Sequence, residues 1–465
     1  MVVNGTTDQP PGIFMVGTAT RNLDFAAGLA MAGYARRHGP SQGTLEPLQA
    51  RALAVADPHG NRVALVALDL VYVTRAIAQA VEERLARSVG LPHQALAISA
   101  THTHSGPDVG NPDDPAGQMV VETAAEAVQA ALGSMAPAEL WSDAVGVEAL
   151  GMNRRNGTAP PLSAHVIVAT RPGRPGDVMA TLLEFACHAT ILEHDNVRYS
   201  PDYPGHARRL IEQLVGGTCV FVQGCSGDIN PVFDSHQPSG AHLAGALLAG
   251  TVGTSLLRSL RHQAGAKYVN LTWNGDYPVT TVSTLRPVPA GRVWAAQGDT
   301  VVDLAALADP AAAAARLAAA RQAFKAGQNG PDHHALGAEL GEAWAQDLRA
   351  SGYMDAVPAD PPTQPTNLTS RVLGLGPAAA ICALPGEVFW TTGQDLRQRL
   401  EAPPHLLLAT CANQAVGYLP PVHEFAEKGY EIGEAGLAKG AAEAVVETTA
   451  GLLAGGGPPG VRAET

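Results

Sequence analysis

The chain has 465 residues, of which 46% are hydrophobic and 16% are charged, and this composition excludes a disordered or collagen-like protein. Thirty basic and 43 acidic residues give a net charge of -13, which is the wrong sign for a surface that binds nucleic acid or an anionic membrane. We therefore expect a small-molecule substrate as the partner, and the oligomeric state stays open.

Five cysteines without a CxxC pair support neither a disulfide framework nor a thiolate zinc site. The first twelve residues lack the basic and apolar regions of a secretion signal. No run of about 18 uninterrupted apolar residues occurs in the chain. These features predict a cytoplasmic protein.

Three passages of the chain each predict a βαβ unit, because two apolar runs of strand length flank an amphipathic helical pattern. In chain order the strand, helix and strand are 63–73, 75–89 and 95–101; 180–187, 204–215 and 218–224; and 378–384, a helix through Arg399, and 406–411.

The segments between these passages follow other patterns. Residues 142–187 and 267–284 alternate like antiparallel strands, and the Ala-rich residues 303–350 predict a helical insertion with a packing or lid role. We therefore expect an α/β fold, with mixed sheets built from several βαβ-like units, antiparallel additions and this insertion. The expected catalytic domain is 13–454, between flexible termini at 1–12 and 455–465.

Each βαβ passage delivers polar, ligand-type residues just past the carboxyl end of an apolar strand, where open α/β sheets place their sites. His102 and His104 follow the first passage, and an extended backbone there would project both to the same side. His188 and Glu387 follow the first strands of the other two passages. Two histidines and a carboxylate with an open position are the usual ligands of a catalytic Zn²⁺.

The residues alone leave other interpretations open. Loop histidines can be hydrogen-bonded without a metal, a histidine at a strand end can be satisfied by the backbone, and a Glu at a helix start can complement the dipole. The loop from Gly224 to Pro231 is neither a P-loop nor a dinucleotide fingerprint, and its Cys225 and Ser226 lack the nucleophile-elbow pattern. A nucleotide site and covalent catalysis are therefore disfavoured.

The segment Ala100-Thr-His102-Thr-His104-Ser-Gly-Pro107 resembles the metal and active-site loop of the neutral/alkaline non-lysosomal ceramidases. These are zinc amidases that hydrolyse the N-acyl bond of ceramide. The resemblance extends from about Met15 to Leu437 and includes Gly33-Tyr34, Asp69, Asn153-Arg154, Leu384-Pro-Gly-Glu387 and the stretch from Asn413 to Tyr418.

The resemblance implies a role for each matching residue. His102, His188, Glu387 and Tyr418 would hold Zn²⁺. His104 would contact the substrate or carry a proton, and Arg154 would face the reacting group. Asn153 and Asp228 would bind the substrate.

Two departures from the family pattern are expected to matter. Asn230 stands where the family has an essential serine, and an amide can hold a water or a carbonyl but cannot act as a nucleophile. The chain also ends near the expected end of the catalytic region, which predicts a short homologue without the family's C-terminal immunoglobulin-like domain. The second departure, together with the net charge of -13, favours a soluble, non-ceramide substrate.

The resulting hypothesis is a zinc-dependent amidohydrolase that cleaves an N-acyl bond with metal-activated water. Arg154 and Tyr418 would stabilise the oxyanion, His104 would pass a proton to the leaving group, and Asn230 would hold water or substrate. The alternatives are an esterase or lactonase on the same scaffold, a phosphomonoester hydrolase, and a non-catalytic metal-binding homologue.

Overall fold

The computed structural model describes residues 11–34, 37, 39–265, 267–270, 275–278, 283–306, 308–327, 333–350, 366–399 and 405–455. The termini expected to be flexible, 1–12 and 455–465, lie outside the described residues except for Gly12, Pro11 and Gly455.

The largest sheet within the described residues has nine strands in the order β4-β3-β2-β1-β5-β7-β8-β9, with β13 paired to β5. The strands are β1 (Ile13–Leu23), β2 (Leu48–Ala56), β3 (Arg62–Leu68), β4 (Leu96–Ala100), β5 (Ala136–Gly146), β7 (Ser163–Arg171), β8 (Arg174–Phe185), β9 (Thr218–Gln223) and β13 (Arg286–Pro287). The sheet bends back on itself, because the last strand β9 contacts β2, β3 and β4 at the other end.

A second sheet has the order β14-β15-β16-β18 and contacts the first through β4 and β9. Its strands are β14 (Val293–Val302), β15 (Thr366–Leu375), β16 (Ala379–Ala383) and β18 (His405–Ala409). Alternating apolar side chains of both sheets form one large buried cluster between them, with Leu65, Val222 and Leu407 among its members. The carboxyl ends of several strands thereby meet in one region.

The three predicted βαβ units and the predicted fold class are confirmed. The strand pairs β3/β4, β8/β9 and β16/β18 are parallel, and each pair is joined through a helix. The joining helices are α1 (Arg75–Val89), α3 (Asp202–Val215) and α7 (Trp390–Gln398). Helix α1 begins where the Thr74 hydroxyl accepts a hydrogen bond from Ile77 N and ends at Gly90, whose φ of 63° suits glycine.

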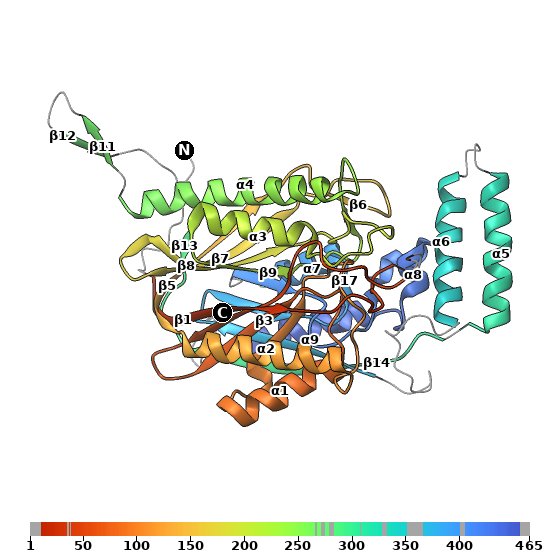
Figure 1. Cartoon of the computed structure of the whole chain (residues 1–465), viewed down its shortest axis with the longest axis horizontal. Coiled ribbons are helices and arrows are strands. Elements are labelled where there is room, and N and C mark those ends of the chain that lie inside the picture. The colour runs from red at the N-terminus through yellow and green to blue at the C-terminus, as the bar shows by residue number, and fades with distance from the viewer. Residues whose placement is uncertain are drawn as a thin grey trace, which may run out of the picture.

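Helices cover both outer sides of the two sheets (Figure 1). Helices α1 and α2 (Pro115–Gly133) lie along one side, and α3 and α4 (Pro238–Gln263) along the other. Helix α9 (Ala441–Gly455) packs on β14 and β15. Helix α4 is the one helix within the described residues that is long and apolar enough to cross a membrane, and half of its most apolar stretch is buried inside the molecule.

The Ala-rich segment contains two helices, α5 (Pro310–Ala326) and α6 (His333–Ala350), which stand beside the body of the molecule (Figure 1). Helix α5 begins at Pro310 after Asp309, whose side chain accepts a hydrogen bond from Ala312 N. Leu317 and Ala320 of α5 pack against Ala343 of α6, so the two helices form a hairpin. We call it the α5–α6 hairpin.

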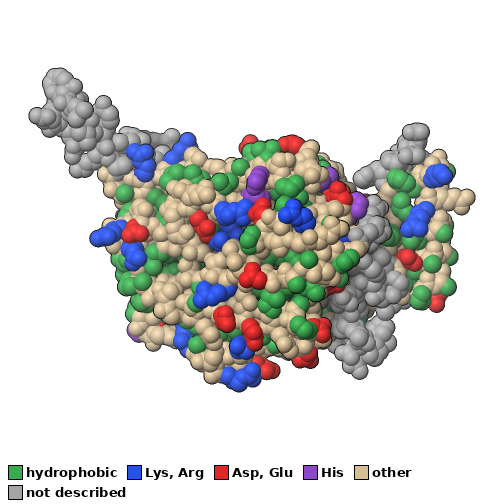
Figure 2. Space-filling view, in the orientation of Figure 1, with side chains coloured by type: hydrophobic (Ala, Val, Ile, Leu, Met, Phe, Trp, Pro, Cys, Tyr) green, Lys and Arg blue, Asp and Glu red, His purple; other side chains and the backbone are tan. Residues whose placement is uncertain are grey.

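The remaining elements are short. They are η1 (His93–Ala95), β6 (Gly151–Asn153), β10 (Ile229–Pro231), β11 (Lys267–Asn270), β12 (Gly275–Pro278), β17 (Glu387–Val388), β19 (Tyr418–Leu419), η2 (Val422–Ala426) and α8 (Tyr430–Glu434). Figure 2 shows acidic and basic side chains interspersed over one face of the molecule, without a large basic patch on that face.

Candidate metal and catalytic site

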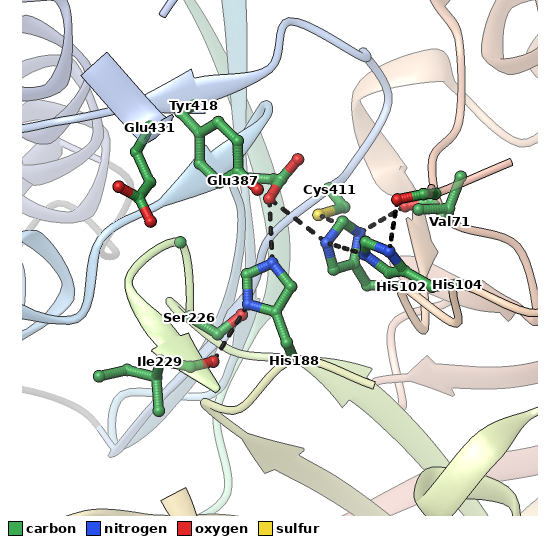
Figure 3. A network of polar contacts seen from close by, with 12 residues as sticks. Val71, His102, His104, His188, Ser226, Ile229, Glu387, Cys411, Tyr418 and Glu431 are labelled. Carbon is green, nitrogen blue, oxygen red and sulfur yellow. Dashed lines mark hydrogen bonds and ion pairs between the residues drawn. The ribbon is translucent and has the colours of Figure 1, made fainter. Parts of the chain in front are cut away.

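Four polar side chains predicted from three separate passages meet at the carboxyl ends of the strands (Figure 3). His102 Nε2 lies 3.4 Å from His104 Nε2 and 3.3 Å from Glu387 Oε2. His188 Nε2 lies 3.2 Å from the same carboxylate oxygen. Three imidazoles and one carboxylate therefore face one small space.

Backbone carbonyl groups orient all three imidazoles through their Nδ1 atoms. His102 Nδ1 is 2.6 Å from Val71 O, His104 Nδ1 is 2.9 Å from Gly33 O, and His188 Nδ1 is 3.1 Å from Ile229 O. A carbonyl oxygen can only accept, so each Nδ1 carries a proton and each Nε2 is the ring nitrogen that faces the shared space. This is how metal-binding histidines are commonly oriented.

The backbone at His102 is not extended, so the expected reason why the two histidines face each other is wrong. His102 has a φ of 62°, in the left-handed region, which non-glycine residues adopt at a cost. Cys411, whose Sγ lies 3.5 Å from His102 Nδ1, also has a positive φ of 49°. The loops around this histidine are thus held in uncommon conformations by the surrounding contacts.

Gly33 is required by the close approach of His104. A Cβ atom at this position would lie 2.7 Å from the imidazole of His104, and the φ of 99° disfavours any other residue. The neighbouring Tyr34 ring stacks at a tilt on His104, with 5.0 Å between the ring centroids. The Gly33-Tyr34 pair therefore builds one wall of the site.

Glu387 and Tyr418 are placed side by side by the short parallel pair of β17 and β19, in which they are direct partners. The Tyr418 hydroxyl accepts a hydrogen bond of 3.0 Å from the Arg154 guanidinium. Arg154 also donates to the side-chain oxygen of Asn230, at 3.1 Å, and to the carbonyl oxygen of Gly227, at 2.9 Å. The structure therefore brings the predicted Arg154, Tyr418 and Asn230 together.

Asp228 and Asn153 are buried beneath these residues. The Asn153 amide donates to Asp228 Oδ2 at 2.6 Å, and Trp390 N donates to Asp228 Oδ1 at 2.8 Å. In the structure both side chains thus hold the loop that carries Arg154 and Asn230. Their contact with a substrate stays a prediction, as does a contact of Tyr418 with a metal.

The electrostatics differ among the donors. Burial opposes a charge on His102, but Cys411 and Glu387 outweigh it and raise the pKa of this imidazole well above its usual value. Burial and the nearby charge of Arg154 lower the pKa of His188 to about 4, and burial together with the other two histidines lowers the pKa of His104 well below its usual value. Burial opposes the charge of Glu387, but His102 and His188 outweigh it and hold the pKa of this carboxyl well below its usual value. The carboxylate is therefore anionic at neutral pH.

The spacing of the donor atoms fits a metal ion. Ligands about 2.0–2.1 Å from a tetrahedral Zn²⁺ are about 3.3 Å from one another. The three separations His102–His104, His102–Glu387 and His188–Glu387 are 3.2–3.4 Å and match that spacing, and the three imidazoles offer nitrogen atoms within 4.8 Å of one another. His104, predicted to carry a proton, thus also has the position of a ligand.

Two site contacts were not predicted from the sequence. Glu431 of α8 is 2.5 Å from Arg154 Nε, and Cys411 contacts the far side of the His102 ring. An acid in a polar segment and a single cysteine have no spacing that points to these partners, so no sequence signal could have found them.

Comparisons with known proteins concern the N-terminal part of the sequence and the fold. A sequence model described as neutral/alkaline non-lysosomal ceramidase, N-terminal, matches residues 14–158, which include His102, His104 and Arg154. This model matches the N-terminal part of the chain, which therefore resembles the neutral/alkaline non-lysosomal ceramidases there.

Relatives of the family resemble this chain over limited segments. Neutral ceramidase 3 of Arabidopsis thaliana is 39% identical over 84 residues, or 18% of this chain and 12% of that protein. The neutral ceramidase of Oryza sativa subsp. japonica is 37% identical over 84 residues, or 18% of this chain and 11% of that protein. The matches to these curated relatives thus span about an eighth of their length.

The fold matches over nearly the whole chain. The crystal structure of neutral ceramidase from Pseudomonas aeruginosa has a TM-score of 0.70 at 18% identity, covering 96% of this chain and 75% of that one. A ceramidase complexed with C2 has a TM-score of 0.69 at 18% identity, covering 96% and 76%. At this identity the likeness concerns the fold alone.

Proposed function

We propose that this chain is a metal-dependent hydrolase that cleaves an amide (N-acyl) bond with activated water, and that its metal is Zn²⁺. The observation that carries the proposal is the pair of Nε2 atoms of His102 and His188 beside the Glu387 carboxylate, with the Nε2 atom of His104 next to them. Imidazole and carboxylate ligands suit Zn²⁺. When bound, Zn²⁺ supplies the Lewis acidity that activates water and polarises a carbonyl.

The chain's own residues supply the other parts of the chemistry. Arg154 and the Tyr418 hydroxyl, which are bonded to each other, are donors for the oxyanion that forms when water attacks a carbonyl. His104 is kept neutral by burial and can take up a proton at Nε2 and pass it to the leaving nitrogen. Asn230, held by Arg154, orients water or the scissile carbonyl.

We further propose a soluble amide rather than ceramide as the substrate. The net charge of -13 supports this choice, because it opposes approach to anionic membrane surfaces. The cytoplasmic location and the lack of a nucleic-acid partner belong to the same proposal.

The test combines metal analysis with a substrate panel. Wild-type protein should carry about one zinc per chain and hydrolyse short N-acyl amides faster than esters, p-nitrophenyl phosphate or long-chain ceramide. His188→Ala and Glu387→Ala should lose the metal and the activity while remaining folded, whereas replacement of the exposed His59 should change neither. Wild-type protein without metal after zinc reconstitution would contradict the proposal, and faster ester hydrolysis would redirect it to an esterase.

A further inference from the structure

Helix α8 touches the candidate site with two adjacent residues that lie outside the group of donor atoms. The ring of Tyr430 meets the ring of Tyr418 edge to face, with 6.0 Å between centroids and 76° between the planes. The carboxylate of Glu431 is 2.5 Å from Nε of Arg154. One turn of helix therefore contacts both of the proposed oxyanion donors.

Glu431 is a buried carboxylate shared between two arginines. It is 4% exposed, and its second oxygen accepts a hydrogen bond of 2.8 Å from Arg155. The nearby positive charges of Arg154 and Arg155 overcome burial and lower its pKa, so the group is ionised. A buried, charge-assisted pair of this kind fixes the orientation of the guanidinium as well as its position. Nε of Arg154 is therefore bonded to Glu431, while the two terminal nitrogens of its guanidinium donate to Tyr418 and Asn230.

Helix α8 in turn rests on the α5–α6 hairpin (Figure 1). Trp344 of α6 lies over Tyr430 with 5.6 Å between ring centroids. A Cβ atom at Gly433 would be 2.5 Å from the carbonyl oxygen of Glu342 and 2.7 Å from Cβ of Ala345, so α8 and α6 pack in direct contact.

The two helices of the hairpin are tied to each other by Arg316. This α5 residue is 2.8 Å from Glu339 and 2.8 Å from Glu342, both on α6. Lys428, just before α8, also pairs with Glu339. The hairpin and α8 therefore form one connected unit that ends at the arginine of the candidate site.

We propose that Glu431 is a positioning residue that holds the guanidinium of Arg154 at the reacting group, and that the α5–α6 hairpin is the brace that fixes α8 in place. This inference rests on the proposed hydrolase function. It gives the Ala-rich insertion a definite task in catalysis, namely to hold the oxyanion donors rather than to bind the metal.

The first experiment compares Glu431→Gln with Glu424→Gln. Both substitutions neutralise a carboxylate that pairs with Arg155, but only Glu431 contacts Arg154. Glu431→Gln should lower kcat by about 10-fold to 100-fold, as misplacement of a catalytic group does, with a much smaller change in KM and no loss of zinc. Glu424→Gln should leave kcat within about 3-fold of wild type. Equal losses in the two variants would overturn the role of Glu431.

The second experiment tests the brace without touching a charged group. Gly433→Ala, on α8, should push α8 away from α6. The control Gly337→Ala, on α6, adds a methyl group 3.5 Å from Phe324, which is an ordinary contact. In hydrogen-exchange mass spectrometry, Gly433→Ala should increase deuterium uptake in residues 151–158 and 429–434, and Gly337→Ala should not. Unchanged uptake in Gly433→Ala would overturn the brace.

A substitute variant and a readout that does not need hydrolysis keep the test of the brace separate from the test of the proposed function. If Gly433→Ala does not fold, Trp344→Ala replaces it, because it removes the α6 ring that lies 5.6 Å from the ring of Tyr430. If the wild-type protein hydrolyses none of the substrates, the proposed function fails, while hydrogen exchange at the Arg154 loop still decides whether the hairpin braces it.

Discussion

Individual residues at the candidate site differ in what holds them and therefore in what their loss should do. His102 is 2% exposed, and its ring lies between Val71 and Cys411 on one side and Glu387 on the other. The ring of His104 contacts the ring of Tyr34 at the edge of the same space, and its Nδ1 is hydrogen-bonded to the carbonyl oxygen of Gly33. Both present Nε2 to the same point, so position alone does not separate a ligand from a proton carrier.

We predict that the two histidines can be separated by metal content. His102→Ala should lose zinc, lose activity and unfold at a lower temperature than wild type, because a bound metal stabilises the native state. His104→Ala should keep zinc and most of its stability, and turnover should fall by about 10²-fold to 10⁴-fold with a flattened limb of the pH profile. The measurements are zinc per chain, thermal melting and kcat as a function of pH. Equal loss of zinc in both variants would show that His104 is a ligand too.

A second residue-level prediction concerns Asn230, whose side-chain oxygen accepts from Arg154. Asn230→Ala should lower turnover by about 10²-fold to 10³-fold, as the loss of a polarising group does, with the metal retained. Asn230→Ser should keep measurable hydrolysis. Asn22→Ala, at an exposed position of β1, serves as the control. An Asn230→Ala enzyme with wild-type turnover would remove Asn230 from the site.

At the scale of elements, the sequence was informative where a pattern is local. The buried positions Ile77, Val81 and Leu85 repeat at helical spacing, and Thr74 and Gly90 mark the ends of α1, so this helix was predicted at its true bounds. The βαβ order likewise predicted which side chains would follow a strand end. These features depend on neighbours only a few residues apart.

Other features depend on contacts between distant parts of the chain, and the sequence could not reveal them. The left-handed backbone of His102 is maintained by Val71 and Cys411, and the role of Glu431 depends on Arg154, which precedes it by 277 residues. The bending of the large sheet that brings β9 to β4 likewise has no local signal. Tertiary packing decides each of these.

One contact between elements predicts how stability depends on pH. His165 of β7 and His405 of β18 lie with 5.4 Å between ring centroids, and burial, with the nearby Arg397, lowers the pKa of each to about 3. Both are therefore neutral in the folded protein, whereas an unfolded histidine has a pKa of about 6.5.

The free energy of unfolding should consequently fall as the pH drops from about 6.5 towards 3, because only the unfolded chain binds these protons in that range. The upper limit is about 1.4 kcal/mol per pH unit for each histidine. Urea unfolding between pH 7.5 and 4.5 should show a shallower pH dependence for His405→Gln than for wild type. The same substitution at the exposed His59 should leave the slope unchanged, and identical slopes in all three proteins would refute the assignment to this pair.

At the scale of the whole molecule, the net charge of -13 governs long-range encounters. We predict that the protein does not cosediment with anionic phospholipid vesicles at physiological salt, and that long-chain ceramide in detergent is turned over much more slowly than a soluble N-acyl amide. Neutral vesicles provide the control for association that does not depend on charge. Efficient ceramide turnover, or binding to anionic but not neutral vesicles, would move the substrate assignment towards the lipid.

The candidate donors come from three βαβ units that the chain contributes in sequence, with His102 first, His188 next and Glu387 near the end. During synthesis the amino-terminal units leave the ribosome first. At that stage only the histidines are available, and the carboxylate, Tyr418 and the brace on Arg154 have yet to be made. We therefore expect the growing polypeptide to lack the complete donor group until almost all of it has emerged, so that completion of the proposed metal site coincides with the last step of folding.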